Sequence, residues 1–211
     1  MSQQGAITAL APAEIVVAEE TSIHLISWTS TIIKRTCRAT LQAESYSLTT
    51  GVERGSRLRA AIVDARGLLT PKRWEETAQA NMFHVWLTDC DSLYEHLVSP
   101  KMSSIQNKRL AIDLQALRQD IWSDDNDRME SLDITKGDDP RWIDTSTMIA
   151  DPLTKAMKPD RLLNTMETGV LDLRPTPESL AIKEKSRKAR QAKKELEKGV
   201  ADEISSIYDG D

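Results

Sequence analysis

Three carboxylates stand where side chains from separate elements could meet. Asp89 directly follows the strand-like run 85–88, Glu44 lies on the apolar stripe of a long predicted helix, and Asp151 precedes a later helix. Like charges brought together cost free energy and shift pKa values, and bound divalent cations offset that cost. Two Mg²⁺ ions held by shared carboxylates can activate a water and stabilise the leaving oxygen of a phosphodiester. These residue types therefore favour metal-dependent phosphoryl chemistry.

Each carboxylate also has a simpler structural explanation. Aspartate is a preferred helix N-cap, so Asp89 or Asp91 could serve only to cap the helix that follows. Asp151 before Pro152 suits the same role, because proline is favoured at the first helical position. Glu44 could reach solvent from a helix edge or pair with a buried arginine. The residues alone leave these alternatives open.

A strand and a helix are predicted on the two sides of Asp89. Residues 85–88 have the β-branched and aromatic composition of a buried strand. Ser92 opens a short helical pattern in which Leu93 and Leu97 are spaced i, i+4. A strand that ends in a carboxylate would place it at the carboxyl end of a sheet, where ligand sites collect in open α/β folds.

The longest helix is predicted to start near Thr36 or Thr40 and to end before Gly67. Its apolar face repeats at helical spacing and also carries Glu44. The face comprises Leu41, Leu48, Val52, Gly55 and Ile62. Gly67 after Arg66 suits the C′ position, where glycine adopts the left-handed conformation.

A second amphipathic helix is predicted for residues 107–122. Its apolar positions are Leu110, Leu114, Leu117 and Ile121. The helix also carries three basic side chains, Lys108, Arg109 and Arg118. The simple explanation of these charges is that they face solvent. The alternative is that they contact phosphates of a nucleic acid.

The remaining elements are predicted from shorter patterns. Strand-like runs cover residues 5–10, 14–18, 131–134 and 141–145, with a turn at 136–140. Residues 21–28 carry apolar side chains on both faces, which predicts a strand covered on both sides and a half-buried, structural His24. Pro71 opens a helix to about Asn81. A last helix runs from Asp160 to Gly169, and its predicted apolar face is Leu162, Leu163 and Met166.

Composition excludes several classes of protein. The 211 residues include 28 basic and 33 acidic side chains, a net charge of −5, and hydrophobic residues make up 39%. No apolar run approaches the roughly 20 residues of a membrane span, and the first 20 residues lack the basic start of a signal peptide. Cys37 and Cys90 stand apart without a metal-site or disulfide pattern. We therefore expect an intracellular protein, cytoplasmic or nuclear, without membrane association.

The chain changes character after Leu173. Residues 174–177, Arg-Pro-Thr-Pro, read as a linker, and residues 183–198 hold eight basic and three acidic side chains. Residues 199–211 hold four acids and no base, so the tail sums to +1 and residues 1–182 carry −6. We predict one domain over residues 1–173 and a charged, helical or disordered tail over 174–211, which either is merely solvated or contacts nucleic acid.

Several segments in order resemble a known family. They are SWTS at 27–30, CRATLQAESYSL at 37–48, VWLTDCDSL at 85–93, KRLAIDLQALRQ at 108–119 and WIDTSTMIADPLTKAM at 142–157. Together they resemble the ribonuclease H domain that closes the Pol polyprotein of Ty1/copia-type retrotransposons. The resemblance covers about residues 2–157, roughly three-quarters of the chain.

The resemblance implies a fold and a reaction. The fold would be α/β, a ribonuclease H-like mixed five-stranded sheet flanked by helices. Glu44, Asp89 and Asp151 would be three of four catalytic carboxylates that bind Mg²⁺ or Mn²⁺, and Asp91 would be a non-catalytic neighbour. The reaction would cleave the RNA strand of an RNA–DNA hybrid, leaving a 3′-hydroxyl and a 5′-phosphate. Lys108, Arg109 and Arg118 would lie near that substrate, and the reverse transcriptase portion of the polyprotein would be a partner.

One departure from the family pattern concerns the start of the chain. In the family, the first catalytic aspartate lies on a first strand upstream of a Ser-Gln-x-Gly segment, which residues 2–5 match here. We therefore expect the first strand and its aspartate to be missing, nuclease activity to be impaired, and a neighbouring strand to have an unpaired edge. The alternative function is a catalytically inactive retroelement remnant that binds nucleic acid or protein.

Overall fold

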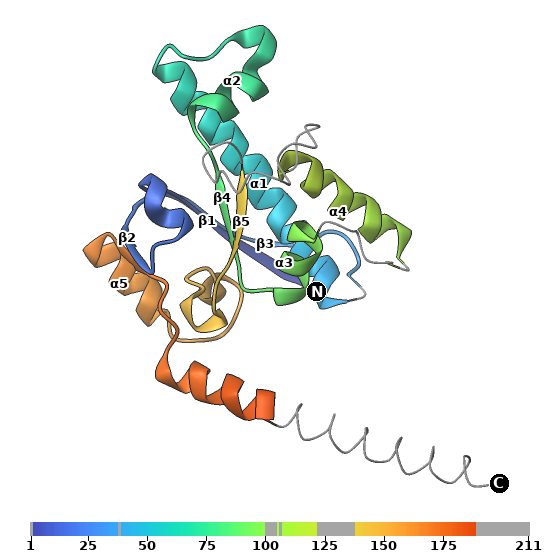
Figure 1. The fold of residues 1–211 in the computed structure, drawn as a ribbon, viewed down its shortest axis with the longest axis vertical. Helices are drawn as coiled ribbons and strands as arrows, with labels where there is room; N and C mark the ends of the chain where they lie inside the picture. Colours follow the sequence, from blue (N-terminus) through green and yellow to red (C-terminus); the bar gives the residue numbers. More distant parts are fainter. Residues whose placement is uncertain (1, 38, 100–104, 106, 122–137, 189–211) are drawn as a thin grey trace, which may run out of the picture. The chain divides into compact units, whose positions relative to one another are not determined.

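The computed structural model describes residues 2–37, 39–99, 105, 107–121 and 138–188. The chain forms two compact units, residues 1–174 and 175–211. The first unit is a mixed α/β fold, as predicted (Figure 1). Its strands form three two-stranded sheets within the described residues, ordered β1-β3, β2-β6 and β4-β5. The first two are antiparallel and the third is parallel. The continuous five-stranded sheet expected from the family resemblance is therefore not formed by these residues.

The N-terminal strands form a long antiparallel pair. Strand β1 (Gln3–Leu10) pairs with β3 (His24–Ile32), and the register shifts between Thr8 and Ala9. The prediction that this region is covered on both sides was wrong, because most of β3 is exposed and Trp28 is 62% exposed. His24 is likewise exposed rather than half-buried.

Two further predictions in the first 30 residues are corrected. The run 14–18 is not a strand, since Ala13–Val16 forms a short 3-10 turn, η1. The strand predicted at 21–28 is divided at Ile23, whose N–H donates to the carbonyl of Gly169 at 2.7 Å. Strand β2 (Glu20–Ser22) pairs with β6 (Val170–Asp172), whereas β3 pairs with β1. The alternation of apolar and polar residues could not show that residues 21–28 contribute to two different sheets.

The segment around Asp89 folds as predicted. Strand β4 is Val85–Thr88, and helix α3 is Asp91–Val98 with Leu93 and Leu97 fully buried. Strand β5 (Asp139–Trp142) pairs parallel to β4, two residues earlier than the strand predicted at 141–145. Asp139 and Pro140 were assigned to a turn but lie in this strand. The predicted strand 131–134 and residues 136 and 137 of that turn lie outside the described residues.

Helix α1 (Thr40–Ala65) contacts both β1 and β4 (Figure 1). Its predicted stripe is correct: Val52 and Gly55 are buried, and Leu41 and Leu48 pack against the main core. The N-cap is Ala39, with no side-chain hydrogen bond, so neither Thr36 nor Thr40 caps the helix. Gly67 follows the helix with φ of 70°, which agrees with the predicted left-handed C′ position.

Helix α4 (Lys108–Ile121) completes the main core. Its four predicted apolar residues are buried in one cluster with Val52, Trp86, Leu93 and Leu97. Asn107 caps the helix, because its Oδ1 accepts from the N–H groups of Arg109 and Leu110 at 3.1 and 3.2 Å. The described part of the chain has no helix that is both long and apolar enough to cross a membrane.

Two helices complete the described part of the first unit. Helix α2 (Trp74–Asn81) follows the 3-10 turn η2 (Pro71–Arg73). Helix α5 (Asp160–Thr168) ends at Gly169, whose φ is 67°. The apolar face predicted for α5 was wrong for two of its three residues, because Leu163 and Met166 are about half exposed, whereas Leu162 is half-buried. Thr165 is the buried residue of this helix.

The second unit is described over residues 175–188. Residues 177–188 are helical, and Lys188 Nζ pairs with Glu184 Oε1 at 2.7 Å, one turn apart. Both side chains of this pair are mostly exposed. The helical form of the predicted tail is thus present over these residues, and the rest of the tail lies outside the described part of the chain.

Gly55 allows α1 to approach the segment before β4. A Cβ at residue 55 would overlap the imidazole ring of His84, whereas a Cβ at Gly51 would have only the Ala6 Cβ within 4.0 Å. We expect Gly55→Ala to lower the free energy of unfolding by about 1–2 kcal/mol, since overpacking outweighs the helical gain. The matched variant Gly51→Ala should raise it by about 0.5–1 kcal/mol. Urea denaturation of both variants tests this, and equal effects at the two sites would contradict it.

His84 is held neutral in the folded protein. Burial lowers its pKa to about 4, and the charge of Arg59 acts in the same direction. Since an unfolded histidine titrates near 6.5, protons bind the unfolded state preferentially between these values. His84 therefore has no effect above pH 6.5 and destabilises the fold progressively as pH falls towards 4, by about 3 kcal/mol at pH 4.

The measurement compares unfolding free energies of the wild type and His84→Gln from pH 7 to pH 4. The difference isolates His84 from the carboxyls of Glu44, Asp139 and Asp151, whose raised pKa values act in the opposite direction. We expect the variant to gain stability relative to the wild type as pH falls. Parallel curves would show that His84 titrates normally.

Candidate active site

The three predicted carboxylates line one cleft of about 450 Å³. Glu44 lies in the second turn of α1, Asp89 follows the last residue of β4, and Asp151 begins the 3-10 turn η5 (Asp151–Leu153). These positions are 45 and 62 residues apart in sequence. The fold therefore brings together all three side chains that the sequence singled out.

Electrostatics show that these groups are close enough to interact. The pKa of Glu44 is raised above its ordinary value, first by burial and then by the negative charge of Asp89, with a smaller contribution from Asp151. The pKa of Asp151 is also raised by burial and by Asp89. A protonation state that depends on neighbouring carboxylates is typical of sites that bind cations or transfer protons.

Lys155 is a residue of this cleft that was not among the candidate residues chosen from the sequence. Its Nζ donates to Asp151 Oδ1 at 2.7 Å, and it lines the same cleft. Burial acts to lower its pKa, but the hydrogen bond and charge of Asp151, with the charges of Asp89 and Glu44, raise it overall. The i, i+4 spacing of Asp151 and Lys155 was the available signal. Lys155 reduces the formal charge of the cluster from −3 to −2.

Helix capping does not explain Asp89, which follows β4, or Asp151, which begins η5. The N-cap of α3 is Cys90, without a side-chain hydrogen bond, so neither Asp89 nor Asp91 caps it. The N-cap of η5 is Ala150, and Asp151 is the first residue of the turn. The simpler explanations therefore fail for Asp89 and Asp151. Glu44 also does not point freely into solvent, since burial is the main cause of its shifted pKa.

The donor chemistry of the cluster fits a hard divalent cation. Mg²⁺ prefers carboxylate oxygens, keeps several waters and commonly takes one or two protein carboxylates together with substrate phosphates. Among the described residues, no group of three His, Cys, Asp or Glu side chains is arranged to hold one ion. Glu44, Asp89 and Asp151 thus line one cleft without forming a closed cage for a single ion.

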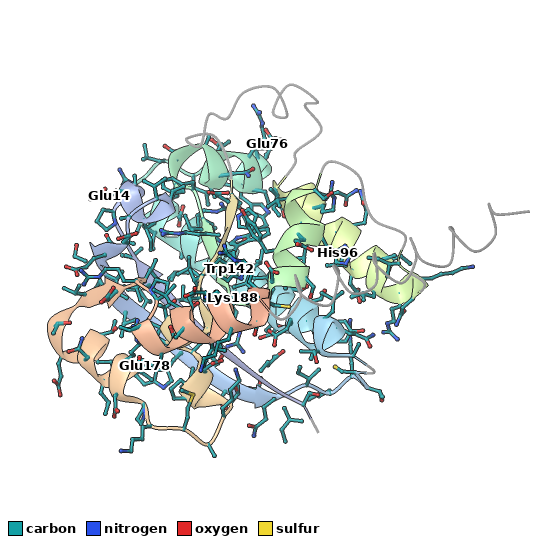
Figure 2. All side chains as sticks on the ribbon, turned by 60° about the horizontal axis from the view of Figure 1, so that its bottom comes forward. Glu14, Glu76, His96, Trp142, Glu178 and Lys188 are labelled. Carbon is teal, nitrogen blue, oxygen red and sulfur yellow. The ribbon has the colours of Figure 1, made fainter. Side chains whose placement is uncertain are left out.

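The predicted nucleic-acid residues do not share one environment. Lys108 and Arg109 are exposed in the first turn of α4. Arg118 instead donates from Nη1 to the carbonyls of His96, Leu97 and Ser99 at 2.8, 3.1 and 2.7 Å. These bonds satisfy the C-terminal end of α3, where His96 is labelled in Figure 2. Arg118 therefore has a structural role, and of the three residues Lys108 and Arg109 are exposed.

Comparison with known proteins gives no neighbour for this chain: no protein-family model, curated protein or solved structure matches it.

Proposed function

We propose that this chain is a metal-dependent nuclease domain of the ribonuclease H type, which hydrolyses the RNA strand of RNA–DNA hybrids. The observation that supports it best is the convergence of Glu44, Asp89 and Asp151 from three elements at one cleft. Like charges that are partly buried do not stabilise a fold by themselves, so we take their meeting at one place as support for cation binding. The cofactor would be Mg²⁺ or Mn²⁺.

The residues of the cluster have distinct tasks in this proposal. Asp89 and Glu44 supply oxygen ligands from the end of β4 and from α1. A bound divalent ion supplies activation of a water and stabilisation of the leaving oxygen of the phosphodiester. Lys155 holds the Asp151 carboxylate by its 2.7 Å hydrogen bond and limits repulsion within the cluster. Lys108 and Arg109 supply positive charge for the phosphate backbone, so substrate binding should weaken as salt increases.

A second candidate function is a non-catalytic module that binds nucleic acid or protein. The observation in its favour is the ion pair itself, because the ammonium group of Lys155 already neutralises part of the charge that a metal would neutralise. The net charge of −6 over residues 1–182 weighs against the nuclease, since hybrid binding favours a basic surface, and within this second candidate it favours a protein partner. This candidate predicts binding without strand cleavage.

A cleavage assay separates the two. A 5′-labelled RNA–DNA hybrid and the corresponding DNA duplex are incubated with the purified chain in Mg²⁺, in Mn²⁺, or in EDTA. The nuclease proposal expects RNA fragments ending in a 3′-hydroxyl only with metal and only from the hybrid. Retention of the hybrid in a binding assay without fragments in either metal would support the second candidate and reject the nuclease.

A further inference from the structure

Strand β3 has one paired edge and one open edge. Among the elements that the structure describes, β1 is the one that packs along β3, and the two strands form an antiparallel sheet of their own. The open edge lies on the side of β3 that faces away from β1. Because β1 stands between this edge and anything that pairs with the far side of β1, the open edge does not depend on what lies there.

The register shows which residues of β3 direct their backbone groups outward. The N–H of Ile33 donates to the carbonyl of Ser2, so residue 33 is a hydrogen-bonded position of the ladder with β1. Hydrogen-bonded and non-hydrogen-bonded pairs alternate along an antiparallel ladder, so Thr31 and Thr29 also bond to β1. The residues between them direct N–H and C=O at the open edge. They are Trp28, Ser30 and Ile32.

This edge lacks the features that usually prevent further pairing. Natural edge strands are blocked by charged side chains, proline, short length or a covering element. Strand β3 has 9 residues and contains no Asp, Glu, Lys, Arg or proline. Its register shift leaves Ile26 without a partner, close to one end of the strand. The remainder of β3 is therefore a regular, uncharged template for another strand.

Apolar side chains follow the open edge on one face. Trp28 is 62% exposed and Ile32 is 52% exposed. Side chains alternate between the two faces of a strand, so both lie on one face, together with Ser30. The Ser30 Oγ donates to the carbonyl of Leu153 at 2.6 Å, which fixes the small side chain between the two large ones. A strand added at this edge would satisfy the backbone groups and cover Trp28 and Ile32 together.

A second copy of β3 complements this edge. An antiparallel pair with its two-fold axis at Ser30 places Trp28 opposite the partner's Ile32. It also places Thr29 opposite the partner's Thr31. Aromatic–β-branched pairs and Thr–Thr pairs are both favourable across an antiparallel ladder. An axis at Thr29 would instead place Trp28 opposite the partner's Ser30 and lose the aromatic–β-branched pair.

We propose that this chain forms a two-fold symmetric dimer through the open edge of β3, with Ser30 at the axis and a second copy of the chain as the partner. The pairing uses the same edge of both copies, so association stops at two. This inference is independent of the nuclease proposal, because it concerns the protein without metal or nucleic acid.

The first test measures amide hydrogen exchange of the full chain in EDTA at different protein concentrations. At a total concentration about 100 times the dimer Kd, mass action leaves about 7% monomer, so exchange at the amides of Trp28, Ser30 and Ile32 should slow about 15-fold. The amides of Thr29 and Thr31 already bond to β1 and serve as internal controls. Sedimentation equilibrium supplies the Kd and should show monomer and dimer. Monomer at every concentration up to about 1 mM, or species larger than the dimer, would overturn the proposal.

The second test uses matched variants. Trp28→Lys places a charge at the pairing edge and should weaken the dimer at least about tenfold. Ile112→Lys makes the same change at a residue of α4 that is 69% exposed, and it should leave the Kd unchanged. Unfolding curves of both variants establish that folded proteins are compared. Equal weakening by the two variants would show that β3 is not the interface.

A mixing experiment tests the register. Trp28→Lys and Ile32→Glu should each dimerise poorly alone, but an equimolar mixture of the two variants should form a heterodimer. In that heterodimer the introduced lysine faces the introduced glutamate across the ladder, and Trp28 still faces Ile32 at the symmetry-related position. Each copy of the natural chain carries a net charge of −5, so salt should not weaken its dimer. A mixture that stays monomeric, or a natural dimer that dissociates as salt increases, contradicts pairing through β3.

Discussion

Asp89→Asn is expected to lower metal-dependent cleavage of an RNA–DNA hybrid by at least about 100-fold. Asparagine keeps the size of the side chain and its position after β4 but removes the negative charge. A carboxylate that holds the ion contributes several kcal/mol to stabilisation of the charge that develops in the transition state. Each 1.36 kcal/mol lost from that stabilisation lowers the rate about tenfold. The measurement is the single-turnover cleavage rate of labelled hybrid across a Mg²⁺ and Mn²⁺ titration.

Asp91→Asn provides a matched control two residues away. Asp91 is exposed in the first turn of α3 and does not line the cleft. Its replacement makes the same chemical change close to the site, so cleavage should stay within about twofold while helix α3 loses a small dipole contribution. If Asp89→Asn and Asp91→Asn reduce the rate equally, the cluster is not the metal site. Unfolding curves of both variants ensure that the comparison is made on folded protein.

We expect Asp138→Asn to lower the free energy of unfolding by about 3–5 kcal/mol, more than any other variant proposed for a stability measurement. Arg59 Nη1 pairs with Asp138 Oδ1, and the Arg59 and Asp138 side chains are only 10% and 3% exposed. The same oxygen accepts from the N–H of His84 at 3.2 Å. Loss of the carboxylate charge leaves the guanidinium buried without its counterion, and uncompensated buried charge is costly. Chemical denaturation measures the change in unfolding free energy.

The exposed pair of Arg57 and Glu53 supplies the control. Its side chains are 77% and 62% exposed, and their separation is 3.8 Å, so Glu53→Gln should leave stability unchanged within error. A double variant, Arg59→Leu with Asp138→Leu, should recover most of the lost stability, because it removes both charges together. A small effect of Asp138→Asn would mean that water reaches Arg59 and screens its charge.

The sequence determined the local elements well. Strand β4, helix α4 with its four buried residues, and the left-handed glycines after α1 and α5 all agree with periodicity and with glycine chemistry. These features depend on neighbours within one or two turns, which a single sequence displays. The choice of Glu44, Asp89 and Asp151 as candidate residues also came from the sequence.

Tertiary structure decided which faces are covered and which groups meet. Trp28 of β3 and Leu163 and Met166 of α5 looked like core residues but are about half exposed or more. The hydrogen bonds of Arg118 to the end of α3 and the division of the strands into three sheets likewise depend on distant segments. Burial and electrostatic interaction depend on distance in space. The sequence therefore named the three carboxylates, and only the fold could bring them to one cleft.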